Sequence, residues 1–370
     1  MALTAAAEEV EIHGDVLETI LSHVPLLDLV SASRVSKWWF HAVSSSLHHR
    51  NPPKPWLILH TQATRFPHAT AAHAYDPRSH VWIKISQPSI HYVSALKSSH
   101  SNFLYMLSPS KFSFSLDPLN CNWSSVDPPL VWRTDPIVAR VGDSVIIAGG
   151  ACDFEDDPLA VEIYNLKTRA WCTAQSMPGN LKDSAALPWL SIATTAEKLV
   201  VADKQSGVTY WFDPETKSWS EPFVLDPGQS VSCYHIGCSN NSLILVGVCR
   251  IEQAVRVKVW RVEGEDHFSC KEIGEMPQEF VGRLKSKSYE NFPIDIRVAG
   301  NMVYVYNTWK AEEVVGAELM GGGGCRWWSM RNVVAREEMM AERLVFSCSE
   351  VGIEELQRAM RMKNCRFEVS

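Results

Sequence analysis

The stretch Val141 to Trp171, VGDSVIIAGGACDFEDDPLAVEIYNLKTRAW, decides the fold of this chain. It holds a Gly142-Asp143 turn, an apolar run, the Gly149-Gly150 pair, a polar loop and a second run that leads to Trp171. Runs rich in β-branched residues and joined by loops predict an antiparallel sheet. One sheet of this size cannot cover its own faces, so several copies are required for a stable core.

Copies of the closing part of this stretch recur along the chain. Each places an apolar residue, a turn and a tryptophan in the same order, and the tryptophans lie 41, 48 and 48 residues apart. The four copies are Tyr75-Asp76-Pro77 to Trp82, Leu116-Asp117-Pro118 to Trp123, Tyr164-Asn165-Leu166 to Trp171 and Phe212-Asp213-Pro214 to Trp219. A weaker fifth copy ends at Phe268, and a sixth ends at Trp327-Trp328. Six units of this length predict a β-propeller of six blades.

The pattern resembles the kelch repeat, which has a Gly-Gly pair after one strand and a Tyr and a Trp around a later turn. The resemblance implies an all-β, six-bladed kelch-type β-propeller. A two-sheet sandwich is the alternative, but a sandwich gives no reason for one signature to recur. We expect the residues of the signature to be structural: Gly149, Gly150, Tyr164, Trp82, Trp123, Trp171 and Trp219.

Two segments remain after six units have been counted. The β-type run Glu342 to Cys348 is expected to complete the first blade and close the ring, which removes an exposed sheet edge. The spacing of Ile353, Leu356 and Met360 predicts a short amphipathic helix lying on the ring.

Residues 12–47 change from strand to helix patterning. Apolar residues recur at helical spacing from Val16 to Val24, and the run stops at Pro25. Asp28 is placed to cap a second helix that reaches Val35, and Ser36 is placed to cap a third. Three short helices make a core that is marginal by itself, so we expect a partner to cover part of their apolar surface.

This helical segment resembles the F-box, the module that docks on the Skp-type adaptor of cullin-RING ubiquitin ligases. The matching residues are Asp15-Val16-Leu17, Ile20-Leu21, Val24-Pro25, Asp28-Leu29, Val35-Ser36-Lys37 and Trp39, while the usual Leu-Pro opening is replaced by Ile12-His13. The alternative for several of these residues, Val35 and Leu21 among them, is the module's own core. The resemblance implies apolar adaptor contacts by Ile12, Val16, Leu17, Pro25, Leu26, Leu27, Leu29, Val35 and Trp39.

The chain therefore divides into five parts. We expect a flexible N-terminus over 1–11, an F-box over 12–50, a linker over 51–55, a propeller over 56–349 and a C-terminal helix and tail over 350–370. The linker, NPPKP, holds three prolines and is predicted to be an extended, stiff spacer.

Composition limits the classes of function. The 370 residues are 46% hydrophobic and 21% charged, with a formal net charge of −7 and no Lys/Arg run that would favour nucleic acid. No apolar run is long enough to span a membrane, and the N-terminus is unlike a signal peptide. Ten cysteines without a C-x-x-C pair argue against zinc or a disulfide framework and suit the cytoplasm and nucleus.

Motifs that carry catalysis are absent from the sequence. We find no G-x-S-x-G, H-E-x-x-H, P-loop or dinucleotide fingerprint. The acidic loop Asp153 to Asp157 is interpreted as solvated rather than as a cation site. We therefore expect a non-catalytic protein without cofactor or metal.

An adaptor-docking module joined to a propeller predicts the substrate receptor of an SCF-type ubiquitin ligase, which acts by bringing its target close to activated ubiquitin. The alternative is a ligase-independent scaffold or an inhibitor that sequesters an enzyme. Over nearly its whole length the chain resembles plant kelch-repeat F-box proteins, most of all those that turn over chalcone synthase. The resemblance rests on IHGDVLETIL, VWRTDPIVARVGDSVIIAGGACDFEDDPLAVE and RLVFSCSEVGIEELQRAM, and it implies chalcone synthase or another phenylpropanoid-pathway enzyme as the target and lower flavonoid output.

Target binding is expected in loops at one end of the ring, where exposed aromatic residues make effective contacts. Packing between blades is the alternative for each candidate. The candidates are Phe154, Trp189, Tyr234, Tyr289, Phe292 and Trp309.

Overall fold

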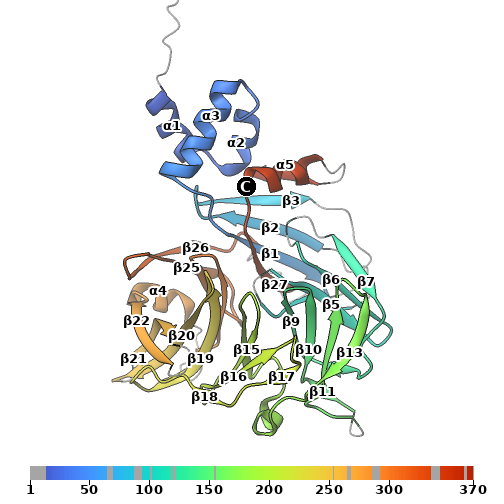
Figure 1. Ribbon diagram of the computed structural model, residues 1–370. Helices are drawn as coiled ribbons and strands as arrows, with labels where there is room; N and C mark the ends of the chain where they lie inside the picture. Colours follow the sequence, from blue (N-terminus) through green and yellow to red (C-terminus); the bar gives the residue numbers. More distant parts are fainter. Residues whose placement is uncertain are drawn as a thin grey trace, which may run out of the picture.

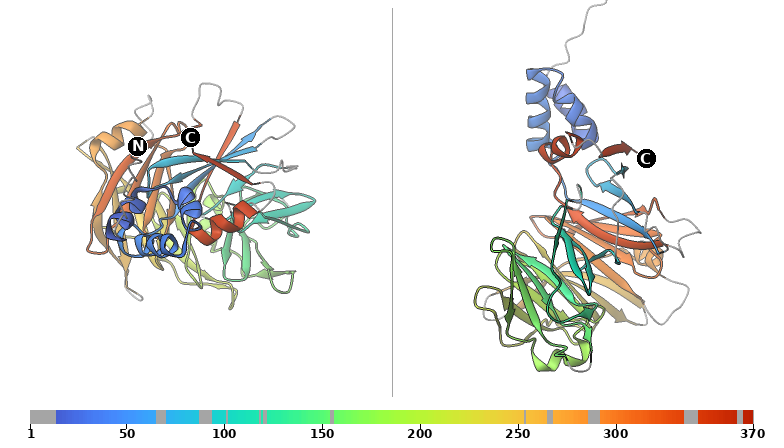
Figure 2. Two further views of the ribbon diagram at one scale, coloured as in Figure 1. Left: turned by 90° about the horizontal axis from the view of Figure 1, so that it is seen from above. Right: turned by 90° about the vertical axis from the view of Figure 1, so that its right-hand side faces the viewer.

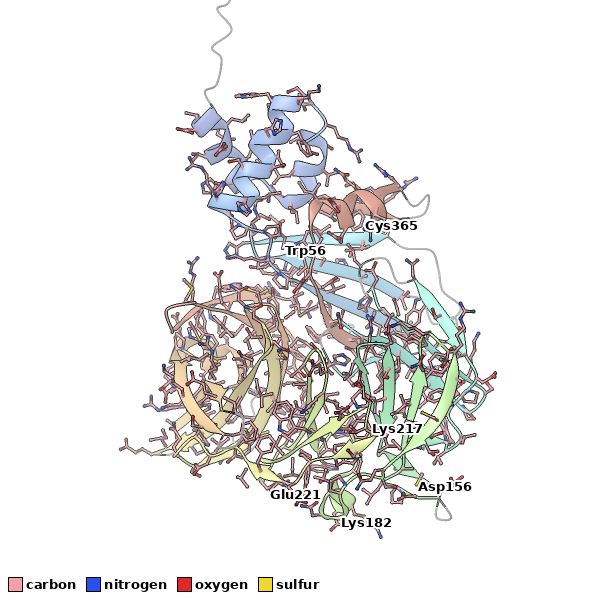
Figure 3. All side chains as sticks on the ribbon, viewed as in Figure 1. Trp56, Asp156, Lys182, Lys217, Glu221 and Cys365 are labelled. Carbon is pink, nitrogen blue, oxygen red and sulfur yellow. The ribbon has the colours of Figure 1, made fainter. Side chains whose placement is uncertain are left out.

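The computed structural model describes residues 14–64, 70–86, 94–100, 102–117, 119, 122–153, 156–252, 254–264, 268–285, 292–334, 342–361 and 365–369. These residues form a small helical module and a larger ring of β-sheets (Figure 1). The module stands at one end of the ring, as the right-hand view of Figure 2 shows. We call this end, which holds Trp56 and Cys365, the helix end. The opposite end, which holds Asp156 and Lys182, is the far end (Figure 3).

The module contains α1 (Gly14–His23), α2 (Leu26–Ala32), α3 (Lys37–Ser45) and one turn of π-helix, η1 (Ser46–Arg50). Ser36 caps α3 as predicted, since its side chain accepts a hydrogen bond from Trp39 N at 3.2 Å. The prediction that Asp28 caps the second helix is wrong. Pro25 occupies the cap position with a φ of −52°, which already suits a helix start, and Asp28 lies in the first turn. Val35 therefore falls in the turn between α2 and α3.

Six antiparallel sheets follow one another around the ring, which is the predicted six-bladed propeller. The first three blades consist of β27 (Glu342–Ser349), β1 (Trp56–Ala63), β2 (Thr70–Asp76), β3 (Val81–Ser86) and β28 (Arg366–Val369); of β4 (Lys97–Ser98), β5 (Leu104–Ser108), β6 (Lys111–Ser115) and β7 (Trp123–Val126); and of β9 (Ile137–Val141), β10 (Ser144–Ala148), β12 (Val161–Asn165) and β13 (Ala170–Ala174).

The other three blades complete the circle. They consist of β14 (Leu190–Thr194), β15 (Leu199–Asp203), β16 (Val208–Asp213), β17 (Ser218–Trp219) and β18 (Phe223–Val224); of β19 (Val231–Ser239), β20 (Ser242–Ile251), β21 (Ala254–Glu263) and β22 (Ser269–Glu275); and of β23 (Ile294–Ala299), β24 (Met302–Asn307), β25 (Glu313–Leu319) and β26 (Cys325–Arg331). The remaining elements are β8 (Arg133–Thr134), β11 (Ala151–Cys152), η2 (Gly179–Ser184), α4 (Gln278–Leu284) and α5 (Ile353–Arg361).

The second strand of a blade is covered on both faces by neighbouring blades. This is why β10 and β24 are continuous apolar runs rather than alternating ones, with Val145 to Ala148 and Met302 to Tyr306 all buried. The burial of whole strands, repeated from blade to blade, supplies the core of the ring.

The ring is closed by strands from the two ends of the propeller sequence. β27 pairs antiparallel with β1 from Trp56 opposite Ser349 to Ala63 opposite Glu342. This is the pairing expected for the C-terminal strand. It leaves β1 without a free edge, because β1 is hydrogen-bonded to β2 on its other side.

The C-terminal segment contributes two further pieces to the first blade. β28 pairs with the outer edge of β3, from Arg366 opposite Ser86 to Val369 opposite Ile83, which the sequence did not predict. α5 lies between the first blade and the helical module (Figure 1). Its buried residues Leu356 and Ala359 share one hydrophobic core with the module and the ring.

This shared core, which we call the junction core, joins the two parts of the molecule. The module supplies Leu17, Leu21, Leu26, Leu27, Leu29, Val30, Ala42 and Val43, and the first blade supplies Trp56, Ile58, Ala72, Ala74, Ile83 and Ile85. Because helices and blade bury the same surface against each other, the module is seated on the ring rather than suspended from the proline-rich linker.

Three of the four repeated tryptophans occupy equivalent positions in their blades, whereas Trp123 lies opposite Ser115 rather than opposite Leu116. Tyr75, Tyr164 and Phe212 lie directly across the strand pair from Trp82, Trp171 and Trp219, with ring centroids 5.3, 5.2 and 4.9 Å apart. The indole N–H groups of these tryptophans donate to a backbone carbonyl of the preceding blade: those of Arg331, Asp127 and Gln175, at 3.1, 3.0 and 3.1 Å. The signature therefore fastens one blade to the next.

The Gly-Gly pair brings a loop close to the third blade. Gly149 and Gly150 have φ values of +65° and +94°, which side chains disfavour. A Cβ at Gly149 would lie 2.2 Å from Ala185 O, and Gly150 N donates to that same oxygen at 2.6 Å. The absence of side chains at both positions thus lets the segment between η2 and the fourth blade pack directly against the backbone of the doublet.

Candidate functional site

The helical module exposes large apolar side chains although its own core is filled. The exposed residues, which we call the module surface, are Val16 and Ile20 on α1, Val35 in the turn, and Trp38 and Phe40 on α3. Val16 and Ile20 are one turn apart and lie on the same face of α1. Val35 is 64% exposed. A surface of this kind on a small module indicates an interaction site.

The described residues among those predicted to contact the adaptor fall into three groups. Val16 and Val35 lie on the module surface, and Pro25 and Trp39 are half-buried. Ile12 lies outside the described residues. The remaining four are buried in the junction core: Leu17, Leu26, Leu27 and Leu29.

The burial of α2 has a specific cause. α2 packs against α5 and the first blade, and Leu26 and Leu29 are fully buried there with Leu356 and Ala359. Leu21 is also buried, as its core interpretation predicted, whereas Val35 is exposed and does not belong to the core. The exposed large apolar side chains of the module therefore lie on α1, in the turn and on α3.

A buried arginine of the first blade holds the module from below. Arg78 Nη2 donates to Leu21 O at 2.8 Å, Nη1 donates to Val24 O, and Nε donates to Asn51 O at 2.9 Å. Leu21 O belongs to the last turn of α1 and also accepts from Val24 N at 3.2 Å, and Val24 directly follows α1, where backbone oxygens have no partner within the helix. The guanidinium therefore caps α1 and fixes the start of the linker at the same time.

Asp76 completes this joint. Its carboxylate accepts from Leu26 N at 3.3 Å and from Arg78 N at 2.9 Å. Asp76 belongs to the first copy of the repeat signature, and Arg78 follows it by two residues. In this blade the repeat turn is thus also the contact that orients the module.

The far end of the ring carries a second exposed apolar set. Trp189 precedes β14 and is 54% exposed, and Trp309 lies between β24 and β25 and is 64% exposed. Leu130, before β8, is 81% exposed. We call these three residues the far-end surface.

The course of the strands places Trp189 and Trp309 at the far end. Leu130 lies there as well, because its N–H donates to Glu162 at the start of β12, directly after the loop that holds Asp156. β24 starts at the helix end, where Tyr304 Oη donates to Pro55 O at 2.8 Å, so the loop after Asn307 lies at the opposite end. Trp189 follows η2, which contains Lys182, at the far end in Figure 3.

The other predicted target-binding residues are placed differently. Tyr234 is buried between the fourth and fifth blades, where its ring covers Gly207. Phe292 is half-buried against the core of the fifth and sixth blades. Phe154 and Tyr289 lie outside the described residues.

A buried ion pair fixes the backbone of the loop that carries Leu130. Glu162 accepts from Leu130 N at 2.6 Å and from Val131 N at 3.3 Å, and it binds Arg133 Nη2 at 2.5 Å. Arg133 and Glu162 are 1% and 2% exposed. Arg133 also donates to Ala160 O at 2.6 Å. A buried pair with this many partners gives the loop a defined shape.

Several exposed residues were not predicted from the sequence. Trp38 and Phe40 occur in an apolar run of α3, where local pattern does not show which side faces the core. Leu130 follows two prolines in a loop, a sign that it lies outside a strand, but its exposure depends on Glu162.

A cavity of about 720 Å³ runs along the axis of the ring. Residues of the inner strands line it, among them Ser98, Ser191, Asp295 and Arg297. In the described part of the chain, no group of three or more His, Cys, Asp or Glu residues is placed to hold a metal ion. None of the described helices has the length and apolar character needed to cross a membrane.

Comparison with known proteins gives two matches. Residues 14–51, which make up the helical module, match the family model described as the F-box domain. An F-box/kelch-repeat protein of Arabidopsis thaliana is 43% identical over 369 residues, covering 96% of this chain and 93% of that relative. The similarity to this relative thus extends over both the module and the ring.

Proposed function

The chain belongs to the F-box/kelch-repeat family, and from this membership we propose that it is the target-recognition subunit of an SCF-type cullin-RING ubiquitin ligase. The module surface binds the Skp-type adaptor, and the far-end surface binds the target. The chain supplies no catalytic step in this scheme. Other subunits transfer ubiquitin, and the target is then degraded by the proteasome.

The observation that carries the proposal is the module surface. Val16, Ile20, Val35, Trp38 and Phe40 are about half exposed or more, although the junction core beneath them is filled by the chain's own residues. Burying a side chain of this size contributes roughly 1.5 to 3 kcal/mol in gross terms. A partner that covers several of them gains substantial affinity, which fits helices docking in an apolar groove.

The joint supports a fixed geometry between adaptor and target. Arg78 and Asp76 bind the ends of α1 and α2, and α5 fills the space between module and blade. A receptor works by raising the local concentration of the target's lysines at the activated ubiquitin, and this effect depends on orientation as well as distance. A seated module keeps the far-end surface in one orientation relative to the adaptor.

The exposed side chains of the far-end surface support the proposal that the target binds there. Trp189 and Trp309 are exposed in loops at the end of the ring away from the module, and tryptophan is enriched among the residues that dominate binding energy. The identity of the target, chalcone synthase or another phenylpropanoid-pathway enzyme, is supported by the resemblance noted in the sequence. Under this proposal the protein lowers flavonoid output.

Adaptor binding is tested with the full chain and a recombinant Skp-type adaptor. Ile20→Asp/Val35→Asp should weaken the Kd by at least about tenfold, because two charges enter an apolar contact. Val224→Asp is the matched control, since Val224 on β18 is 54% exposed but lies on the ring. Both variants should melt at the temperature of the unchanged protein. Unchanged affinity of the double variant, or no binding by the unchanged chain, contradicts the proposal.

Target binding is tested by recovery of partners from plant extract, identified by mass spectrometry. Trp189→Ala/Trp309→Ala should lose the target enzyme and keep the adaptor, whereas Ile20→Asp/Val35→Asp should lose the adaptor and keep the enzyme. A ligase-independent scaffold predicts instead that ubiquitination of the recovered enzyme is the same with and without the module surface.

A further inference from the structure

A cysteine, a histidine and an aspartate form a row beside the axis of the ring, with the histidine between the other two. Cys233 and His235 are two residues apart on β19, so their side chains lie on the same face of the strand. Cys233 Sγ is 3.3 Å from His235 Nε2. On the neighbouring innermost strand, β23, Asp295 Oδ1 is 3.7 Å from His235 Nδ1.

The aspartate is itself held in place. Arg297 Nη1 donates to Asp295 Oδ2 at 2.9 Å, and Tyr306 Oη donates to the same oxygen at 3.0 Å. Arg297 Nε is fixed by Phe346 O at 2.9 Å. The carboxylate is therefore oriented by two donors on one oxygen and presents the other oxygen to His235.

We propose that Cys233, His235 and Asp295 form a reactive thiolate site, at which Cys233 is modified covalently by hydrogen peroxide. A thiol beside a histidine, with a carboxylate at ion-pair distance from the histidine, is an arrangement that activates thiols in proteins. The proposal does not depend on the ligase function, since it concerns the chemistry of the thiol alone.

The chemical step is balanced by the groups present. The Cys233 thiolate attacks one oxygen of hydrogen peroxide, and the O–O bond breaks. The sulfur loses two electrons and becomes a sulfenic acid, while the departing hydroxide takes a proton from the His235 imidazolium and leaves as water. Asp295 stabilises the imidazolium before the step, and neutral histidine remains after it.

The charges around the thiol favour this state. Burial raises the pKa of Cys233, and so does the negative charge of Asp295. The contact with His235 and the positive charges of His235 and Lys204 lower it. The lowering effects are larger, so the pKa of the thiol lies below its ordinary value. Burial lowers the pKa of His235, and contacts with Asp295 and Cys233 overcome this and raise it, against the charge of Lys204. Thiolate and imidazolium therefore stabilise each other.

Other cysteines of the chain differ. Burial raises the pKa of Cys270 and Cys325 to about 11, and it also raises the pKa of Cys238, which lies on β19 like Cys233. Among the described cysteines with a shifted thiol pKa, Cys233 is the one shifted downward. Reactivity is therefore expected to be selective.

The position of Cys233 connects it with solvent and with the far-end surface. The side chain is half-buried, and Lys204 and Asp295 beside it line the axial cavity. Tyr234 N donates to Lys204 O at 2.8 Å, and Lys204 N donates to Trp189 O at 3.0 Å. The thiol thus lies at the far end, two main-chain hydrogen bonds from the exposed Trp189.

The first test measures alkylation of the full-length protein by iodoacetamide as a function of pH, with each cysteine quantified by mass spectrometry. We expect Cys233 to react at least about tenfold faster than Cys238 at pH 6.5, with a midpoint well below the 8.5 or so of a free thiol. The midpoint is independent of how open each site is, so differences in exposure do not affect it. A midpoint at or above that of a free thiol, or no labelling of Cys233 in the folded protein, overturns the proposal.

The second test uses His235→Asn and peroxide. The variant should raise the midpoint of Cys233 toward that of a free thiol and slow its alkylation at pH 6.5 by at least about tenfold, while Cys238 is unchanged. Peroxide followed by dimedone should label Cys233 in the unchanged protein and leave Cys233→Ser without this adduct. A folded His235→Asn with the original midpoint contradicts the proposal. If this variant does not fold, the pH profile of the unchanged protein still decides.

Discussion

Arg78 of the first blade donates a hydrogen bond from Nη2 to the backbone oxygen of Leu21, 57 positions earlier in the chain, at 2.8 Å. This contact caps α1 with a charged group from the ring. Because the same guanidinium also binds Val24 O and Asn51 O, the end of α1, the linker and the first blade form one polar joint. The joint and the junction core together determine how the module sits.

Arg78→Met should loosen the module while leaving most of the ring intact. The substitution keeps an unbranched apolar stem but removes all three side-chain donors, which takes a charged partner from the oxygens of Leu21, Val24 and Asn51 at a cost of about 2 to 4 kcal/mol. Amide hydrogen exchange in α1 and α2 should accelerate at least about tenfold, with little change in β10 or β24. Arg34→Met, at an exposed residue of the module, is the control. Equal exchange in both variants would show that the joint contributes little.

Leu356→Ala should weaken adaptor binding although Leu356 lies more than 300 residues from the module in sequence. Leu356 is fully buried in the junction core, so its truncation should destabilise the protein by about 2 to 5 kcal/mol. Loss of this support beneath α2 should lower both the melting temperature and the fraction of protein able to bind the adaptor. Met360→Ala, at a more exposed position of the same helix, should leave both unchanged. Normal adaptor binding by Leu356→Ala would show that the module folds without α5.

Trp171→Ala should lower stability, whereas Trp189→Ala should weaken target binding. Trp171 is half-buried, packs on Tyr164 and bonds to Asp127 O of the preceding blade, so its removal should cost about 2 to 4 kcal/mol of unfolding free energy. Trp189 is largely exposed, and its removal should cost less than about 0.5 kcal/mol while reducing target binding. Chemical denaturation of both variants measures the difference. A loss below about 1 kcal/mol for Trp171→Ala would exclude its role as a fastener between blades.

Stability should fall as the pH drops from about 6.5 to 4. Burial lowers the pKa of His60 to about 4, and burial with the charge of Arg297 lowers that of His100 to about 4. In this window the unfolded chain binds protons that the folded chain does not, so the free energy of unfolding rises with pH. Each histidine accounts for about 3 kcal/mol over the whole window.

The contribution of His60 to the pH dependence of the unfolding free energy is measured with the variant His60→Gln. The pH-dependent part of the unfolding free energy should shrink by about 2 to 3 kcal/mol in this variant, whatever constant offset the substitution adds. Denaturant titrations at several pH values between 4 and 7 provide the measurement. An identical pH dependence in both proteins would mean that the pKa of His60 is the same in the folded and the unfolded chain.

The ring was predictable because its blades repeat one local signature at a fixed interval. The spacing of Trp82, Trp123, Trp171 and Trp219 indicated the repeat, and the weaker copies that end at Phe268 and Trp327-Trp328 brought the number of blades to six. Helices α1 and α3 were predictable for a similar reason, since apolar spacing and the Ser36 cap are local. Asp28 misled the prediction because a carboxylate is favourable both as a cap and in the first turn, and Pro25 decided between the two.

Long-range partners could not be predicted from local pattern. Arg78 follows a turn that looks like those of the other copies, and nothing near it in sequence shows that its partners are Leu21 and Val24. The pair Arg133 and Glu162 is 29 residues apart, and each side chain alone looks like an ordinary surface charge. For the proposed target site, local pattern does not separate Trp189 and Trp309, which are exposed, from Tyr234, which packing buries between two blades.

The closing pair of β1 and β27 also sets an order of events during synthesis. β1 emerges from the ribosome near the start of the chain, and its inner neighbour emerges almost 300 residues later. Leu356 and Ala359, which complete the core beneath α2, emerge later still. A nascent or prematurely terminated chain therefore lacks the strand that closes the ring and the helix that supports α2, so we expect it to bind the adaptor less tightly than the full chain.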